Sequence, residues 1–475
     1  MSKMPTAMLN KILLFALSLA VAIFFGLLTV QSFTITLALA LAILIGLFLV
    51  EKPHWGIIFA LLSILVGQLF RIPYGEGGGI VLSDILLPVI VLIYFWRLIY
   101  FGKIPKSPLT LPLLWFIIIA LVGLLATLSI YTASENLVAA FYLFRLIIYT
   151  LFFYVVLAED KSYQFLDLLF WIGFGFAVAG LVQYFIFPDL SKLGLTGWDP
   201  HFQRVFSTFL DPNFAGGFLA ILILLATSLW FYGFWKDKIL RFAVFVPVYL
   251  AAFYLTYSRS SYLALALGLL ILGLIKARRI VVILFAAALI FFSIVPFEKL
   301  PERFQERLSG ITSLDLTAQA RLKSWQLGGK ILEDHLWLGT GYNHLYSVKA
   351  EYDKTVAPGH SAFGFDSSFL TIAVGTGILG IIPFILLYII IFYQAVVKYK
   401  KGKPLQQGMG LAMIAIIPSL VVHSTFVNSL LYPQLMIVLW YLAGLLYKNP
   451  KLKSQMSNET QSPNVKKFGI KALKH

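Results

Sequence analysis

The chain enters one of its last apolar segments through the stretch DSSFLTIAVGTGILG (residues 366–380), which follows a polar-rich interval at residues 297–365. Nearly all side chains with acid, base or phosphate-binding chemistry lie in that interval or at the same ends of neighbouring apolar segments. Because these groups gather at one mouth of the apolar segments, we expect the protein to process a molecule there rather than to act as a passive anchor.

The composition is that of a membrane protein, since 60% of the 475 residues are hydrophobic and only 12% are charged. A transmembrane helix needs about 20 apolar residues. Candidate spans lie at 11–30, 33–50, 55–70, 82–101, 109–130, 137–158, 164–187, 213–233, 239–257, 260–275, 279–296, 367–395, 407–427 and 430–447. We therefore predict an all-α polytopic membrane protein with about 12–14 transmembrane helices and a large helical cap loop before the last spans.

The net charge of +16 is concentrated in short connections such as 97–106, 236–241, 276–279 and 398–403, and in the tail. These alternate with poorly charged connections, as the positive-inside rule predicts, so we expect no nucleic-acid partner. The same rule places both termini in the cytoplasm. It directs outward the segments 71–81, 131–136, 188–212, 256–261, 297–365 and 423–429.

Four regions follow from this pattern. Residues 1–296 form the N-terminal membrane helices, 297–365 the extracytoplasmic cap loop, 366–447 the C-terminal membrane helices, and 448–475 a basic cytoplasmic tail that we expect to be disordered. The first apolar run is long and lacks a small-residue cleavage site, so we interpret it as an anchor rather than a signal peptide. The chain has no cysteine, which excludes disulfides and thiolate metal sites.

The cap interval carries eight Lys or Arg and eight Asp or Glu residues, which is typical of a folded segment rather than a charged tail. An apolar stripe within it predicts a helix near 316–335 that packs on the membrane region, through Leu322, Trp325, Leu332 and Leu336. Gly339-Thr340-Gly341 is expected to end this helix.

The first candidate site is RVFSTFLDPN (residues 204–213), on the outward side before a span that begins with Gly216 and Gly217. The Arg204 guanidinium is suited to bidentate contact with a phosphate. Asn213 is expected to cap the first turn of the following helix, whose N-terminus favours anions, and Asp211 is a supporting residue. The alternative is that Arg204 extends to outer lipid headgroups.

Two further arginines are candidate anion ligands. Arg259 follows Ser258 in a short outward turn between two apolar runs, where its charge needs a substrate phosphate, a lipid headgroup or a carboxylate as partner. Arg321 lies one residue before the apolar stripe of the cap helix, and either turns towards a cavity beneath the cap or lies on a solvated face.

Asp366 and His360 are candidate general bases at the exit of the cap loop. The alternative for Asp366 is a helix N-cap, because Asp-Ser-Ser before an apolar run is a good helix start. Arg145 lies within a span and is expected to form a structural ion pair with Glu135 or Asp84. We expect no bound metal and no cofactor, because no cluster with metal-ligand spacing appears.

Three segments together resemble the bacterial O-antigen ligase and Wzy-type O-antigen polymerase superfamily. Residues 204–217 are similar to its R…F…PN…G stretch, and LTYSRS (255–260) is similar to its T-x-S-R turn. The segment from Arg321 through Trp325 and Glu333-Asp334-His335 to Gly339-Thr340-Gly341-Tyr342 is similar to its cap helix. The resemblance extends over roughly residues 200–385.

One position departs from the ligase pattern, in which a His precedes a polar residue, nine residues and Gly-x-x-Gly. Here Asp366-Ser367 stands before nine residues and Gly377-Ile378-Leu379-Gly380, while His360 is six residues upstream and out of register. This departure favours a polymerase over a ligase.

The resemblance implies a GT-C-like, inverting and metal-independent glycosyltransferase in the bacterial cytoplasmic membrane, with its active site outside the cytoplasm. Its donor would be an oligosaccharide on a polyprenyl diphosphate such as undecaprenyl diphosphate, held by Arg204, Arg259 and Arg321. Its acceptor would be a second lipid-linked glycan in a polymerase, or another lipid or a protein in a ligase. Asp366 would be the base, and a chain-length regulator is a possible partner.

A transporter of lipid-linked glycan is the alternative from another class. It predicts inverted repeats and a charged central cavity, whereas this chain places its charge at one mouth.

Overall fold

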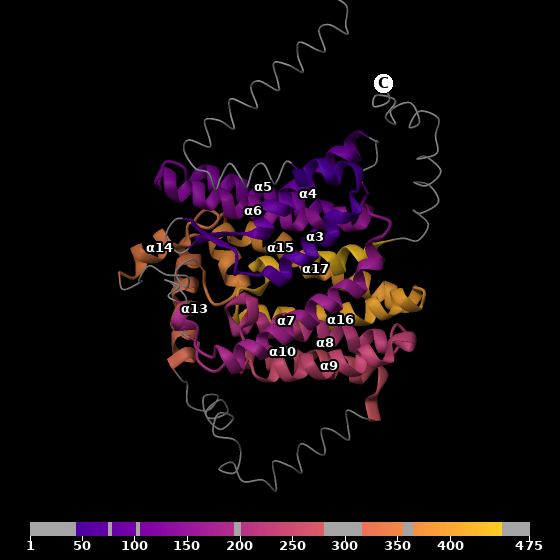
Figure 1. Ribbon diagram of the computed structural model, residues 1–475. Coiled ribbons are helices and arrows are strands. Elements are labelled where there is room, and N and C mark those ends of the chain that lie inside the picture. Colours follow the sequence, from indigo (N-terminus) through magenta and orange to yellow (C-terminus); the bar gives the residue numbers. More distant parts are fainter. Residues whose placement is uncertain are drawn as a thin grey trace, which may run out of the picture.

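The computed structural model of the chain describes residues 44–74, 78–100, 105–193, 201–279, 316–354 and 364–448. Within these ranges the fold is a bundle of helices that run side by side (Figure 1). Seven helical segments are long and apolar enough to cross a membrane: α4 (Leu82–Tyr100), α6 (Ala133–Ala158), α7 (Leu166–Ile186) with the turn η1 (Ser162–Phe165) before it, α8 (Pro212–Trp230), α10 (Arg259–Lys276), α15 (Ser368–Lys401) and α16 (Pro404–Phe426). The predicted all-α polytopic membrane fold is confirmed.

Shorter helices complete the bundle: α3 (His54–Val66), α5 (Thr110–Ala126), α9 (Ile239–Tyr254) and α17 (Pro433–Tyr447), with the 3-10 turns η2 (Leu190–Leu193), η3 (Ser207–Phe209), η4 (Lys236–Lys238) and η7 (Ser429–Leu431). The predicted spans 11–30, 33–50 and 279–296 lie wholly or largely outside the described residues, and every other predicted span coincides with a helix. At 13 and 15 residues, α3 and α17 are shorter than the roughly 20 residues that a lone spanning helix needs.

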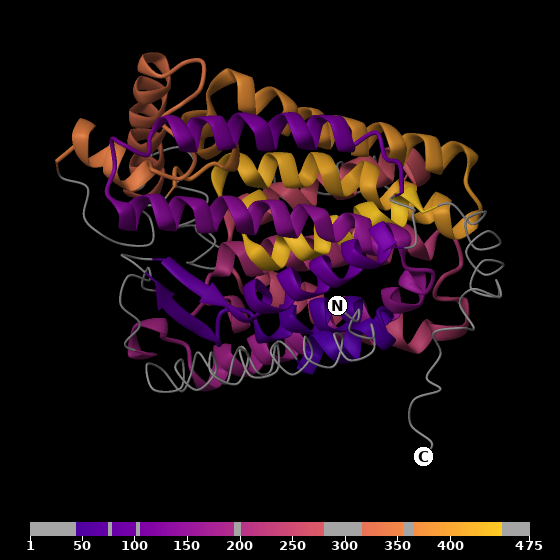
Figure 2. The ribbon, with the colours of Figure 1, turned by 90° about the horizontal axis from the view of Figure 1, so that it is seen from above.

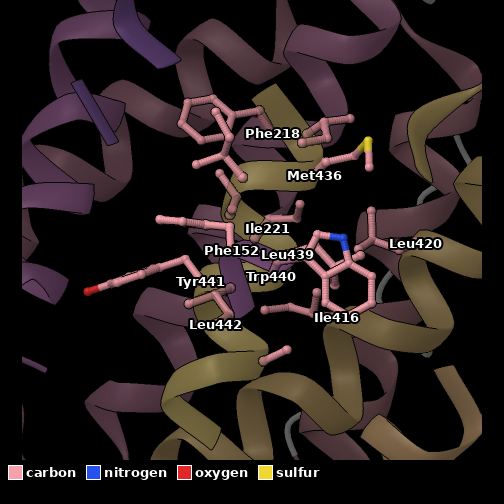
Figure 3. Close-up of a cluster of buried hydrophobic side chains, with 14 of the residues drawn as sticks. Phe152, Phe218, Ile221, Ile416, Leu420, Met436, Leu439, Trp440, Tyr441 and Leu442 are labelled. Atoms are coloured by element: carbon pink, nitrogen blue, oxygen red, sulfur yellow. The ribbon is translucent and has the colours of Figure 1, made fainter. Parts of the chain in front are cut away.

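The centre of the bundle is α17, which is buried from Pro433 to Leu446. Trp440 and its neighbours on α17 pack against Phe152 of α6, Phe218 and Ile221 of α8, and Ile416 and Leu420 of α16 (Figure 3). Lipid tails are as apolar as these side chains, so close van der Waals packing, rather than exclusion from water, holds such helices together. The last described helix of the chain is therefore its structural core.

All the outward segments predicted from charge come together at one end of the bundle, as far as they are described. The helices α13 (Leu316–Asp334) and α14 (Leu345–Tyr352), which we call the cap helices, lie at this end with a β-hairpin (Figures 1 and 2). The hairpin pairs β1 (Arg71–Tyr74) antiparallel to β2 (Gly78–Val81), with Ile72 opposite Ile80. It was not predicted, because the sequence analysis assigned 71–81 only as a connection.

The predicted ion pair of Arg145 is confirmed, with Asp84 as the partner. Arg145 Nε donates to Asp84 Oδ1 at 2.7 Å, and its Nη2 donates to the Gly79 carbonyl at 2.7 Å and to Asp84 Oδ2. Tyr149 also donates to Asp84 Oδ1, at 2.9 Å. Glu135, the other expected partner, instead forms a capping box at the start of α6. The buried pair therefore joins α4, α6 and the hairpin.

The predicted cap helix is present, and half of the expected stripe packs on the membrane region: Leu332 contacts a buried cluster and Trp325 contacts Phe426. Leu322 and Leu336 are 43% and 39% exposed, whereas Ile331 is fully buried and Gly328 lies against Leu370. Helical spacing fixes which residues share a face, but the neighbour that the helix meets decides which face is buried. The cap helix turns Gly328 and Ile331 towards α15.

A break in α15 receives the loop that follows the cap helix. Gly377 interrupts α15 with a φ of +64°. Ile378 N–H donates to the Leu336 carbonyl at 2.8 Å, and Thr340 N–H donates to the Val374 carbonyl at 2.9 Å. The loop thus satisfies backbone groups that the broken helix leaves open. Non-helical backbone within a membrane protein is tolerated only where protein or a cavity surrounds it.

Gly377→Ala is expected to destabilise the folded protein by about 2 kcal/mol or more, because a side chain disfavours the left-handed backbone and would collide with the Trp337 carbonyl. The measurement is the thermal unfolding of the purified protein in detergent. Gly329→Ala is the matched control, since a Cβ at Gly329 in α13 meets nothing within 4 Å. Equal melting temperatures for both variants would contradict this account of the break.

Candidate active site

Two of the motifs found in the sequence contact each other through Arg204. Its Nε donates to the Thr256 carbonyl at 2.8 Å, and its Nη2 lies 3.4 Å from the Tyr257 carbonyl and 3.5 Å from Asn213 Oδ1. Next to it, Val205 N–H donates to the Leu255 carbonyl at 2.8 Å. The loop before α8 and the turn before α10 are therefore joined side by side, and the planar guanidinium lies at the junction.

The backbone around this junction is strained. Among the described non-glycine residues, five have positive φ, and four of them lie here: Gln203, Ser207, Leu210 and Tyr257. Each such residue costs on the order of 1–3 kcal/mol, and such conformations concentrate at functional sites. The surrounding structure holds this loop and turn against their local preference, which makes the junction a candidate site independently of its charge.

The expectation that Asn213 caps α8 is wrong. Asp211 is the N-cap, and it accepts the N–H groups of Asn213 at 2.6 Å and Phe214 at 3.3 Å. Pro212 takes the first helical position, where proline is favoured, so the residue before it becomes the cap. Burial alone would raise the pKa of Asp211, but His201 and the Asn213 N–H lower it to about 2. Asp211 is thus an ionised structural cap.

Asn213 instead takes part in a buried network of hydrogen bonds. Its Oδ1 accepts from Ser258 Oγ at 2.9 Å, and Ser258 is itself the N-cap of α10. Ser261 Oγ lies 2.9 Å from Ser258 Oγ and 3.0 Å from His423 Nε2. His423 Nδ1 in turn lies 2.6 Å from Ser429 Oγ. The network joins the starts of α8 and α10 to the end of α16.

His423 is a site residue that the sequence analysis did not single out, because residues 423–429 were assigned only as an outward connection. Its side chain is buried, with 1% of the residue exposed. The sequence does hold one signal. A Cβ at Gly216 would collide with Ser261 and one at Gly217 with the His423 ring, so the Gly pair of α8 permits this close approach.

Arg259 begins a helix at this junction, and the charge of Arg321 acts on the neighbouring His423. Arg259 is the first residue of α10, directly after Ser258, and is partly exposed. Arg321 lies on the cap helix α13, also partly exposed, and its charge acts on His423. The three arginines predicted as anion ligands therefore come from the loop before α8, the turn before α10 and the cap.

Asp366 lies just before α15 and is exposed. The alternative that it caps α15 is wrong, because Ser367 is the N-cap and accepts the Leu370 N–H at 3.3 Å. The carbonyl of Asp366 accepts from Trp325 Nε1 of the cap helix at 3.4 Å. The Asp366 carboxylate is therefore not used by the helix start. His360, the second predicted base, lies outside the described residues.

The end of α16 connects the arginine junction with the Asp366 segment. Phe426 packs against Trp325, with ring centroids 5.7 Å apart. Ser368 Oγ donates to the Val427 carbonyl at 3.3 Å, and Thr371 Oγ1 donates to Asn428 Oδ1 at 3.0 Å. We call residues 423–429 the linking segment. Through His423 it contacts the serines at the start of α10, and through Val427 and Asn428 it contacts the start of α15.

Lys349 of α14 is a second residue that the sequence analysis missed. Only 5% of this lysine is exposed. Its ammonium donates to the Gly364 carbonyl and lies 4.4 Å from the centre of the Phe365 ring. No pattern in the sequence marks it, because the cap holds several other lysines.

Among the residues that the structure describes, no three His, Asp or Glu side chains come close enough to hold a metal ion. A requirement for a divalent ion is a question for the assay proposed below.

Residues 244–385 match the family model described as O-antigen ligase. This part of the chain is therefore similar to that family. The expected superfamily is confirmed, and with it a function in glycan transfer at a membrane. No curated protein matches the chain. Arg259, Arg321 and Asp366 lie within the matched segment, whereas Arg204 precedes it and contacts it through Thr256 and Tyr257.

Arg204→Lys is expected to lower the rate of glycan transfer roughly tenfold or more, although the positive charge is kept. An ammonium cannot reproduce the fork of donors to Thr256, Tyr257 and Asn213, and a hydrogen bond from a charged group is worth about 1.5–3 kcal/mol.

The control is Arg241→Lys, in which a single Nη1 contacts Asp167 at 2.8 Å and an ammonium can take its place. Transfer rates and melting temperatures of both variants are compared with the unmodified protein. An unchanged rate in Arg204→Lys would show that the geometry of the guanidinium is not used.

Proposed function

We propose that the protein is a metal-independent, inverting glycosyltransferase that polymerises surface polysaccharide on the outer face of the bacterial cytoplasmic membrane. The donor is a glycan on a polyprenyl diphosphate, and the acceptor is a hydroxyl of a second lipid-linked glycan. The linking segment joins the junction of Arg204 and Arg259 to the segment of Asp366, and the cap helix that carries Arg321 contacts the linking segment and Asp366 through Trp325; this arrangement carries the proposal.

The reaction needs a group for each of its two charges. The acceptor oxygen forms a bond to the anomeric carbon of the donor sugar, and Asp366 takes the proton of the acceptor hydroxyl. The bond from that carbon to the diphosphate breaks, and its electron pair leaves with the polyprenyl diphosphate. Arginine side chains stabilise the growing charge on the leaving diphosphate through charge-assisted hydrogen bonds. Attack opposite the leaving group inverts the anomeric configuration.

The position of Asp366 supports its role as base. It is the residue directly before the N-cap of α15, and its carboxylate is not used to cap the helix. Trp325 and the linking segment fix the backbone on either side of it. A carboxylate beside the cap helix that carries Arg321 is suited to a reaction in which a base and a cation act together.

A ligase is the second candidate, because the domain match is to a family described as O-antigen ligase. In that case the finished glycan passes to another lipid or to a protein. Asp366 in place of the ligase histidine favours the polymerase.

The test is a reconstituted assay with one pure polyprenyl-diphosphate oligosaccharide as the only substrate. A ladder of lengthened lipid-linked products, formed equally with and without EDTA, is expected. Transfer only after a separate acceptor is added would indicate a ligase. Loss of activity in EDTA that a divalent ion restores would contradict the metal-independent mechanism. No release of polyprenyl diphosphate under any condition would contradict glycosyl transfer and favour a transporter.

Asp366→Asn is expected to lower the transfer rate about 10²–10⁴-fold, the usual contribution of a general base, with little change in stability. Ser367→Ala is the matched control. It removes the N-cap of α15 and is expected to cost about 1 kcal/mol of stability while the base remains. If Asp366→Asn kept the rate and lost stability instead, Asp366 would have a structural role only.

A further inference from the structure

A buried lysine lies beside the segment that carries the proposed base. Lysine is almost never fully buried unless it is paired, because removing its charge from water is costly. Lys349 is nevertheless 5% exposed, in a helix of the cap where an apolar side chain would fill the same space. The contacts of its ammonium therefore need an explanation beyond packing.

Those contacts converge on the residues before Asp366. The Lys349 ammonium donates to the Gly364 carbonyl, and it lies 4.4 Å from the Phe365 ring centre, a cation–π distance. The negative charge of Asp366 also acts on Lys349. One side chain thus interacts with three consecutive residues, of which the last is the proposed base.

The helix that carries Lys349 is fixed to the membrane region. Ser347 donates to Glu135 at the start of α6, and His344 Nε2 lies 3.0 Å from Asn136 Oδ1. The His344 ring also stacks on Tyr131 at 4.2 Å. Because α14 is held on α6, the Lys349 ammonium holds residues 364–366 in a fixed place relative to α6.

Other charged groups on the neighbouring elements have contacts of their own. Glu135 of α6 binds Ser347 and caps its own helix. On α13, Asp334 accepts from Tyr352 at 2.6 Å, and Lys330 lies 5.7 Å from the Tyr352 ring centre. The negative charge of Asp366 acts on Lys349 and opposes the effect of its burial.

We propose that Lys349 is a positioning residue for the proposed base: its ammonium fixes Gly364 and Phe365, and its positive charge favours the ionised form of Asp366. This inference rests on the proposed function, in which Asp366 accepts the proton of the acceptor hydroxyl. Lys349 itself touches neither substrate nor the reacting atoms.

The role depends on pH in a defined direction. Burial lowers the pKa of Lys349 to about 8, against the opposing effect of Asp366. Below that pH the ammonium is charged and both interactions are present. Above it the cation–π contact and the field on Asp366 are lost, so the transfer rate should fall as pH rises through about 8. On the acid side, an opposite charge nearby lowers a carboxyl pKa.

The experiment measures the pH dependence of kcat/KM for the full-length protein and three variants in the reconstituted assay. Lys349→Met removes the charge and keeps the length. It is expected to lower kcat/KM roughly tenfold at neutral pH. The fall of kcat/KM on the acid side of the pH profile should also shift to a pH about one unit higher. Lys349→Arg keeps a cation at every accessible pH, so the fall near pH 8 should disappear. Lys330 is an exposed lysine on α13, and Lys330→Met is the control. Its kcat/KM should fall at the same acid and alkaline pH as that of the unmodified protein.

A second measurement does not depend on activity. Hydrogen exchange of the peptide covering residues 364–371 should speed up in Lys349→Met and stay slow in Lys349→Arg.

The outcomes separate the two proposals. No polyprenyl diphosphate release by the unmodified protein would contradict the proposed function. If the unmodified protein is active and Lys349→Met is slower but its kcat/KM falls at the same pH values, Lys349 has a structural role only. If Lys349→Met behaves like the unmodified protein, Lys349 has no role. Either result overturns the inference. If Lys349→Met does not fold, Lys349→Arg decides, because a fall near pH 8 that persists in it also overturns the inference.

Discussion

The interaction on which the rest of this structure depends is the docking of the loop after α13 onto the break in α15. The break exposes backbone groups, and a membrane offers no water to satisfy them. Thr340 and the Leu336 carbonyl supply the partners, and Gly377 allows the left-handed turn that makes room for the Trp337 carbonyl. This contact fixes the cap helices on the bundle. It therefore also fixes where Arg321, Trp325 and Lys349 lie relative to Asp366.

The end of α16 has a comparable role on the other side of the site. Its linking segment combines a buried histidine, an aromatic ring and main-chain carbonyls within seven positions. Each contacts a different element, so the starts of α8, α10 and α15 are held in one arrangement. The Gly pair of α8 and the serines of α10 are small because the helices meet closely there, as is usual where membrane helices pack.

The charged residues of the site differ in how deeply they are buried. The Arg145–Asp84 pair is buried within the bundle, and Asp211 is committed to the start of α8. Arg259, Arg321 and Asp366 lie at exposed or partly exposed positions at the capped end. The proposed glycosyl transfer would use the charges at the capped end, while the buried ion pair holds the helices behind them.

The sequence by itself determined the membrane class, the positions of the helices, the cap helix and the family. These depend on hydropathy, on helical period and on short motifs, all of which are local along the chain. The tertiary structure alone decided which residues meet. Ser261 and His423 are 162 positions apart, and Ser347 and Glu135 are 212 apart, so no local pattern pairs them. The same reason explains the error at Asn213, the omission of His423 and the exposure of Leu322 and Leu336. A residue's type limits which contacts it can make, but whether Asp211 or Asn213 caps α8, and whether Lys349 is buried, is settled by the elements that pack around them.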